Sequence, residues 1–88
     1  MPHGTYSLHE RALHTVLSAD ERDARQLITA FEWIAENPVG AAVAAVLNEE
    51  GHVRYAVGVG EFTILYAIAR SGRHVFITDV RLALRGDR

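Results

Sequence analysis

The 88-residue sequence has no cysteine and only two prolines, and all nine of its basic residues are arginine. Without cysteine the chain can form no disulfide, no thiolate nucleophile and no cysteine-ligated zinc site. Its longest uncharged stretch, residues 37–48, is far too short to span a bilayer. The first residues lack the basic and apolar regions of a secretory signal. We therefore expect a cytoplasmic protein with no membrane segment.

The residues that are present are typical of one small folded domain. Hydrophobic residues make up 49% of the chain and charged residues 23%, a balance that favours a globule over a disordered tail. A chain of this length leaves room for a single compact core. We expect residues 1–88 to form one domain.

Charge is divided unevenly between the two halves of the chain. Residues 1–50 carry eight carboxylates against three arginines, and residues 51–88 carry six arginines against three carboxylates. The overall formal charge of −2 argues against nucleic-acid binding by bulk basicity. The guanidinium groups of the second half nevertheless suit phosphate or carboxylate. The absence of lysine itself is better explained by codon bias in a GC-rich genome.

The first half predicts a short strand at residues 6–9 followed by two helices. Apolar residues of 9–17 form one helical stripe. A second helix is predicted from Ser18 as N-cap, because Glu21 follows at capping-box spacing, and it ends at Asn37 because a proline comes next. Residues 40–47 fit either a short helix or a packed connection.

The second half changes to a period of two, which predicts strands. Three of them are expected, at residues 53–59, 62–69 and 74–80, joined by a turn at residues 60–61 and a two-residue loop at residues 71–72. A short tail follows from Arg81. The predicted fold class is α+β, with two N-terminal helices packed on a small antiparallel sheet.

Several patterns that would indicate catalysis are missing. Among the five histidines, His9 and His14 lie five residues apart, which separates them by about 140° on a helix, and no metal-binding motif is present. Glycines 58 and 60 stand between two strands, whereas a dinucleotide-binding motif leads into a helix. Glu32 and Glu36 belong to a charged, solvated helix face. We expect no metal and no cofactor, and the residue pattern defines no catalytic group.

The arginines of the sheet half are the candidate binding residues. Arg54 alternates with apolar residues, so it is expected on the sheet face away from the helices, while Arg81 and Arg85 follow the last predicted strand. Such a group could hold a phosphate backbone or an acidic partner segment. Charged residues that serve only solubility and edge protection explain the pattern equally well. Trp33 fits a position at the core edge better than an interface anchor.

The order of elements and several sequence pieces resemble the RelE/ParE superfamily of bacterial toxin–antitoxin toxins. The pieces are Tyr6-Ser7-Leu8 ahead of Glu10-Arg11-Ala12-Leu13, the helix end Glu36-Asn37-Pro38, Tyr55-Ala56-Val57 followed by the segment from Gly60 to Tyr66, and Val75-Phe76-Ile77. The resemblance covers most of the chain. It implies a growth-inhibiting toxin that acts on the ribosome and its mRNA or on DNA gyrase, and that a protein antitoxin neutralises.

Carried over residue by residue, the resemblance supports target binding more than RNA cleavage. Members that cut mRNA use basic sheet residues, an arginine in the central strand, and an arginine and a tyrosine near the C-terminus. Arg54 matches a basic sheet residue and Arg81 lies near the C-terminal arginine. Thr63 replaces the central arginine, and no tyrosine follows Tyr66.

The resemblance therefore implies that Arg54, Arg81 and Arg85 contact the target, and it assigns no catalytic residue. The main alternative is a non-catalytic protein-interaction domain on the same scaffold, homodimeric through the Trp33 helix or a sheet edge. An mRNA-cleaving enzyme with altered catalytic groups ranks last.

Overall fold

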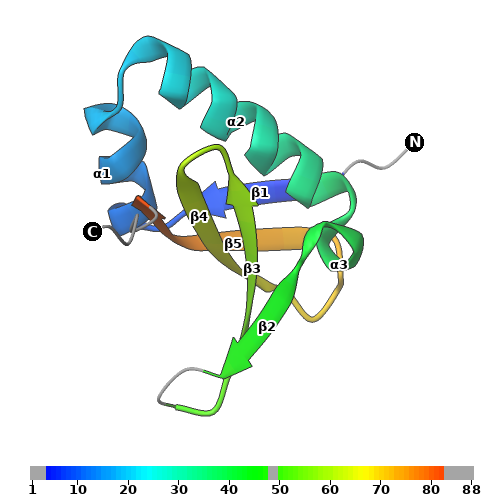
Figure 1. Ribbon diagram of the computed structural model, residues 1–88. Helices are drawn as coiled ribbons and strands as arrows, with labels where there is room; N and C mark the ends of the chain where they lie inside the picture. The colour runs from blue at the N-terminus through cyan, green and yellow to red at the C-terminus, as the bar shows by residue number, and fades with distance from the viewer. Residues whose placement is uncertain (1–3, 48–49, 83–88) are drawn as a thin grey trace.

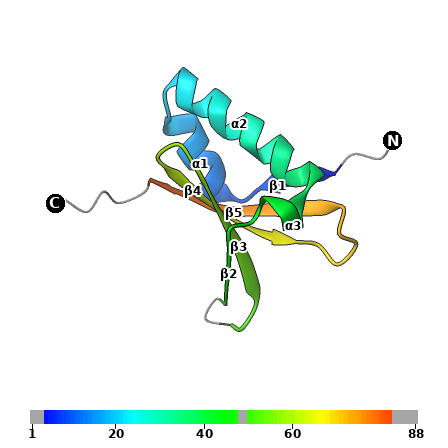
Figure 2. The same cartoon turned by 45° about the vertical axis from the view of Figure 1, so that its right-hand side comes forward.

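The computed structural model describes residues 4–47 and 50–82, and the helices lie on one face of a single sheet (Figures 1 and 2). The α+β prediction is confirmed. The elements in chain order are β1 (Thr5–Leu8), α1 (Glu10–Ser18), α2 (Glu21–Glu36), α3 (Pro38–Ala41), β2 (Ala44–Leu47), β3 (Val53–Val59), β4 (Phe62–Ile68) and β5 (His74–Leu82).

The sheet is larger than the predicted three-stranded meander and is mixed. Its five strands follow the order β1-β5-β4-β3-β2, with β1 parallel to β5 and the other pairs antiparallel. The predicted leading strand is therefore one edge of the sheet. The other edge, β2, comes from residues 40–47, where the sequence left helix and connection open. Alanine-rich segments rarely indicate strands, so pairing with β3 decides this conformation.

Helix α2 begins two residues later than the sequence predicts. Its N-cap is Asp20, whose side chain accepts the Asp23 backbone N–H at 2.8 Å. Ser18 is instead the last residue of α1. The chain Ser-Ala-Asp offers two good capping residues, and α1 uses the first of them as helix. At the other end the N–H of Asn37 bonds to the Trp33 oxygen at 3.1 Å, so the predicted C-terminus is confirmed.

The connection between β4 and β5 is longer than the predicted two-residue loop. The Ala69 N–H bonds to the His74 oxygen at 2.8 Å, and the Gly72 N–H bonds back to the Ala69 oxygen at 2.8 Å. Gly72 has φ 78°, which glycine adopts without steric cost. Strand β5 also runs on to Leu82, so Arg81 lies within it, paired with Thr63, rather than in a tail.

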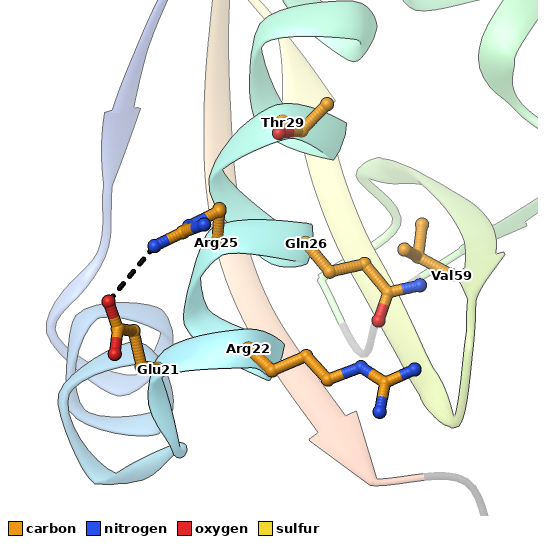
Figure 3. Close-up of a pocket in the computed structure, with 6 residues that line it drawn as sticks. All are labelled: Glu21, Arg22, Arg25, Gln26, Thr29 and Val59. Atoms are coloured by element: carbon orange, nitrogen blue, oxygen red, sulfur yellow. Dashed lines mark hydrogen bonds and ion pairs between the residues drawn. The ribbon is translucent and has the colours of Figure 1, made fainter.

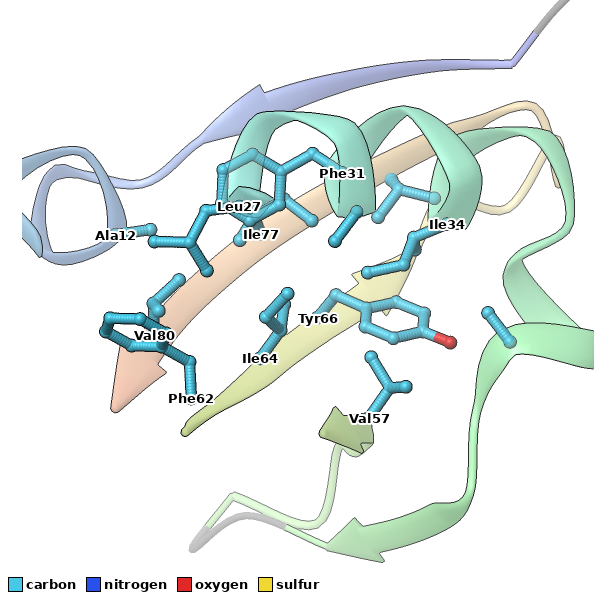
Figure 4. Packing of buried hydrophobic residues seen from close by; sticks show 13 residues of the cluster. Ala12, Leu27, Phe31, Ile34, Val57, Phe62, Ile64, Tyr66, Ile77 and Val80 are labelled. Atoms are coloured by element: carbon cyan, nitrogen blue, oxygen red, sulfur yellow. The ribbon is translucent and has the colours of Figure 1, made fainter. Parts of the chain in front are cut away.

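The core lies between the sheet and the helices (Figure 4). Phe31 and Ile34 of α2 are fully buried, as are Ile64 and Tyr66 of β4. The Tyr66 hydroxyl donates a hydrogen bond of 2.5 Å to the Pro38 carbonyl, which ties the central strand to α3. Burial raises the pKa of Tyr66 above its usual value of 10.0, and Tyr55 raises it further.

A β-bulge in β5 decides which residues face away from the helices. Leu65 of β4 pairs with Asp79 while the next residue, Tyr66, pairs with Ile77, so Thr78 is an extra residue. A regular strand would put Ile77 and Arg81 on the same face, because side chains alternate. The bulge shifts this phase, so that Val80 is buried at 3% exposure and Arg81 is exposed.

Candidate functional site

The sheet face opposite α1 and α2, here called the open face, carries a shallow hollow of about 490 Å³. Strands β3, β4 and β5 supply its floor, and the start of α1 supplies one wall. Three arginines line it, together with two carboxylates, a histidine, a threonine and a leucine. These residues are Arg11, Arg54, Arg81, Glu50, Asp79, His9, Thr78 and Leu65. Two of the predicted site residues, Arg54 and Arg81, are therefore brought together.

Arg81 is positioned by an ion pair along its own strand. Its Nε donates to Asp79 Oδ2 at 2.9 Å, and the Asp79 side chain is only 17% exposed whereas that of Arg81 is 65% exposed. The pair occupies one edge of a guanidinium that has five N–H donors. Arg81 makes no other hydrogen bond to a described residue, so its remaining N–H groups can donate to an anion.

Arg54 reaches the same hollow from β3. Its neighbours Tyr55 and Val57 pack toward the core, so alternation puts Arg54 on the open face, as predicted. Its one hydrogen bond within the described chain, from Nη1 to the Val53 carbonyl, is long at 3.4 Å. A bond of that length is weak, and it leaves the guanidinium able to turn toward a ligand.

His9 and Arg11 line the hollow although the sequence does not predict them there. The His9 backbone N–H bonds to the Ile77 oxygen at 2.9 Å, which fixes the start of α1 beside the bulge. This placement follows from the parallel pairing of β1 with β5, in which Leu8 lies beside Ile77. Sequence periodicity carries no information on that pairing. The signal that was available is the position of His9 at the end of the predicted leading strand.

The remaining predicted site residue, Arg85, lies outside the described residues. Within residues 4–47 and 50–82 no group of three histidine, cysteine, aspartate or glutamate side chains could hold a metal ion. None of the helices described in this chain is both long enough and apolar enough to cross a membrane.

A second hollow, of about 610 Å³, lies between α2 and the β3–β4 turn (Figure 3). Arg22 and Gln26 extend from α2 toward Val59, whereas Arg25 turns to the other side and pairs with Glu21 at 2.9 Å. This hollow contains one unpaired cation among the described residues, Arg22, and no histidine. It offers contact area and one unpaired cation, and its one carboxylate, Glu21, is paired with Arg25.

Apolar side chains are exposed along the β2 edge of the sheet. All four residues of β2 are exposed, and Leu47 has 70% of its surface accessible. Val43 and Val53 beside them are exposed as well. A strand edge with open backbone groups and no charge is the kind that pairs with another chain. Trp33 is 47% exposed on α2, so it lies at the surface beside the core.

The fold is that of RelE toxins. The most similar structures include RelE in the RelE–RelB complex of Pyrococcus horikoshii OT3, at 13% sequence identity and a TM-score of 0.74, with 98% of this chain and 100% of that chain covered. The toxin–antitoxin complex RelBE2 of Mycobacterium tuberculosis matches at 18% identity and 0.75, covering 99% and 95%. The isolated E. coli RelE toxin matches at 18% and 0.75, covering 96% and 88%. The sequence matches no family model and no curated protein.

Proposed function

We propose that this protein is the toxin of a type II toxin–antitoxin module and that it arrests growth by binding RNA at the ribosome through the open face. The observation that carries the proposal is the meeting of Arg11, Arg54 and Arg81 in one hollow. Guanidinium groups bind phosphate in a forked geometry and remain charged at any physiological pH. The likeness of the fold to RelE structures supports the same assignment.

Binding and cleavage are separate questions at this site. Cleavage by a 2′-hydroxyl requires a group that takes its proton, a group that protonates the leaving oxygen, and donors that stabilise the charged phosphorane. The arginines can supply the last of these. Histidine is the side chain best suited to exchange protons near neutral pH, so His9 is the candidate for the first. Thr63 stands where the resemblance implies a further arginine.

Induced expression tests the growth arrest directly. We expect the wild-type protein to stop growth, and Arg54→Gln combined with Arg81→Gln to relieve the arrest. Arg22→Gln combined with Arg25→Gln is the matched control, because it also removes two guanidinium groups, from α2 on the other side of the molecule, and is expected to leave the arrest unchanged. Full toxicity of the Arg54 and Arg81 double variant would refute the assignment of the hollow.

The target is identified by what fails first in arrested cells. Ribosome binding predicts that protein synthesis stops while plasmid supercoiling is retained. Loss of supercoiling with translation intact would move the target to DNA gyrase. In vitro, affinity for single-stranded RNA should fall as salt rises. The slope of log K against log salt should become less steep by about 0.7 for each phosphate contact that is removed.

The exposed β2 edge supports a protein antitoxin as the partner. An extended segment can add to such an edge through backbone hydrogen bonds, with side chains covering the apolar residues. We expect a small protein encoded beside this one to restore growth when co-expressed. Leu47→Glu puts a charge on the edge and should weaken that rescue while leaving the arrest intact.

The same edge favours the alternative, a non-catalytic interaction domain that forms homodimers. Two copies of β2 can pair without charge repulsion, because the strand carries no ionised side chain. This alternative predicts a dimer in sedimentation equilibrium that Leu47→Glu converts to a monomer, together with growth unaffected by expression. Growth arrest by a monomeric protein would exclude it.

A further inference from the structure

An exposed aromatic side chain stands on the open face next to the arginine hollow. Phe76 of β5 is 45% exposed, while its neighbours Val75 and Ile77 are fully buried in the core. Phe76 therefore projects from the sheet on the side of Arg54 and Arg81. Beside it on this face lie Ala67 of β4 and Ser7 of β1, its partners in the sheet. These neighbours are small, and nearly half of the Phe76 surface is accessible.

The ring of His74 supports Phe76 and is itself held in place. The two rings meet edge to face, with centroids 4.8 Å apart and planes at 73°, an arrangement that aromatic pairs favour. Both nitrogens of His74 are in hydrogen bonds: Nδ1 with Thr5 Oγ1 at 2.7 Å and Nε2 with Ser7 Oγ at 2.6 Å. The aromatic pair is thus fixed to two strands before any ligand binds.

The register puts this pair close to the arginines. Phe76 pairs with Ala67, the residue after Tyr66, and Arg54 precedes Tyr55, which pairs with Tyr66. Continued by one residue, this register puts Ala67 of β4 between Arg54 of β3 and Phe76 of β5. Arg54 and Phe76 are therefore two strands apart, roughly 10 Å at the usual strand spacing. Ala67 lies between Arg54 and the phenyl ring, and along β5 the carboxylate of Asp79, which is paired with Arg81, lies between Arg81 and Phe76. Phosphate-binding cations at one end and an exposed aromatic side chain at the other are the two parts of a single-strand binding surface.

We propose that Phe76 is a stacking platform for one unpaired nucleobase of the RNA whose backbone lies on Arg54 and Arg81. This inference rests on the proposed function, and it adds the contact that distinguishes single-stranded from duplex RNA. A base inside a duplex is already stacked and cannot reach the ring. Since every base has an aromatic face, the contact tolerates different sequences.

Stacking and phosphate contacts respond differently to salt, and this difference tests the proposal. The probe is a short single-stranded RNA with one 2-aminopurine, whose fluorescence falls when the base stacks. Phe76→Leu should weaken binding by roughly 5- to 150-fold, the range for loss of one base–aromatic stack, and should abolish the quenching. It should leave the slope of log K against log salt unchanged, whereas Arg54→Gln should make that slope less steep by about 0.7. Phe76→Trp should retain affinity and quenching.

The control is Leu17→Ala, which removes another exposed apolar side chain, 74% exposed on α1, and should not alter RNA binding. Circular dichroism confirms that each variant is folded. Wild-type affinity and quenching in Phe76→Leu, with weaker binding in Arg54→Gln, would refute the stacking platform and leave the proposed function standing. Equal affinity for single-stranded and duplex RNA would also refute the platform. No RNA binding by the wild-type protein would refute both.

Discussion

At the scale of single residues, Tyr66 links the central strand to the end of the helical layer. Its hydroxyl donates to the Pro38 carbonyl, and the whole residue is buried. We expect Tyr66→Phe to lower the free energy of unfolding by about 1 kcal/mol, because a partly buried carbonyl loses its donor. Urea unfolding at pH 8 measures this loss.

The same residue makes stability depend on alkaline pH. Burial raises the pKa of Tyr66 in the folded state above 10.0, the usual value. Above pH 10 the unfolded chain releases this proton first, so stability is complete below that pH and falls as pH rises. Burial, with Glu32 as a second cause, also raises the pKa of Tyr6, so Tyr66→Phe should remove part of the fall. A stability difference between wild type and Tyr66→Phe that stays constant from pH 8 to pH 11 would contradict this account.

The start of α2 offers a matched pair of substitutions. Asp20→Ala removes the cap on the Asp23 N–H and should cost about 1 kcal/mol of stability. Ser18→Ala should cost much less, because Ser18 is exposed at the end of α1 and makes no capping bond to α2. Urea unfolding of the two variants decides which residue is the N-cap. A larger loss for Ser18→Ala would restore the capping box that the sequence predicts.

The sequence predicts that arginines of the sheet form the candidate site, but it does not predict every residue that lines the hollow. Arg54 is predictable because strand alternation places it opposite Tyr55 and Val57. His9 and Arg11 come from the other end of the chain, and only tertiary packing brings them to the hollow. Capping is ambiguous for a related reason: Ser18 and Asp20 both suit an N-cap, and the length of α1 selects between them.

At the scale of secondary-structure elements, the bulge at Thr78 lets Ile77 and Val80 both face the core while Arg81 stays on the open face. A one-residue slip in a strand transfers every later side chain to the opposite face. Periodicity alone predicts a regular strand over residues 74–80 and cannot show that Val80 and Ile77 are both buried three positions apart. Periodicity also cannot show that the sheet is mixed, since the parallel pairing of β1 with β5 depends on the path of the chain through the three helices and three strands between them.

Deletions test this role of the bulge. Removal of Thr78 leaves Ile77 and Val80 two positions apart, so β5 becomes regular with Arg81 still on the open face. We expect a cooperative urea transition weakened by about 1 kcal/mol for the lost Thr78–Leu65 hydrogen bond. Removal of Phe76 instead reverses the faces of the strand on one side of the gap and should abolish the cooperative transition. Similar stabilities for the two deletions would show that strand phase does not determine the fold.

At the scale of the whole molecule, the uneven charge of the sequence becomes a division between layers. The acidic first half forms the helices, and α2 shows Glu32 and Glu36 at the surface. The basic second half forms most of the open face. A chain with a net charge of −2 can therefore present a local cluster of guanidinium groups to a phosphate backbone. A negative net charge therefore does not exclude binding to nucleic acid when the fold places acidic and basic residues on different layers.

This division also places the proposed target and partner surfaces side by side. Val46 of the β2 edge pairs with Arg54 of β3, so a segment added to that edge would lie about 10 Å from the Arg54 strand at the usual strand spacing. Neutralisation is then expected to be competitive. A neighbouring-gene antitoxin that rescues growth should lower the affinity of the wild-type protein for single-stranded RNA, measured by fluorescence anisotropy at fixed salt.

Two variants separate the surfaces and complete the test. Arg54→Gln with Arg81→Gln should lose RNA binding and growth arrest but still bind the antitoxin, because β2 is unchanged. The Leu47→Glu variant should still arrest growth, because the arginines of the hollow are unchanged. It should resist rescue by the antitoxin, because the apolar β2 edge now carries a charge. An exposed substitution of this kind should change the free energy of unfolding by no more than about 0.5 kcal/mol, so altered folding would not account for the result. If antitoxin and RNA bind together without mutual loss of affinity, inhibition must act at a distance from the hollow, and the β2 edge is not the neutralising surface.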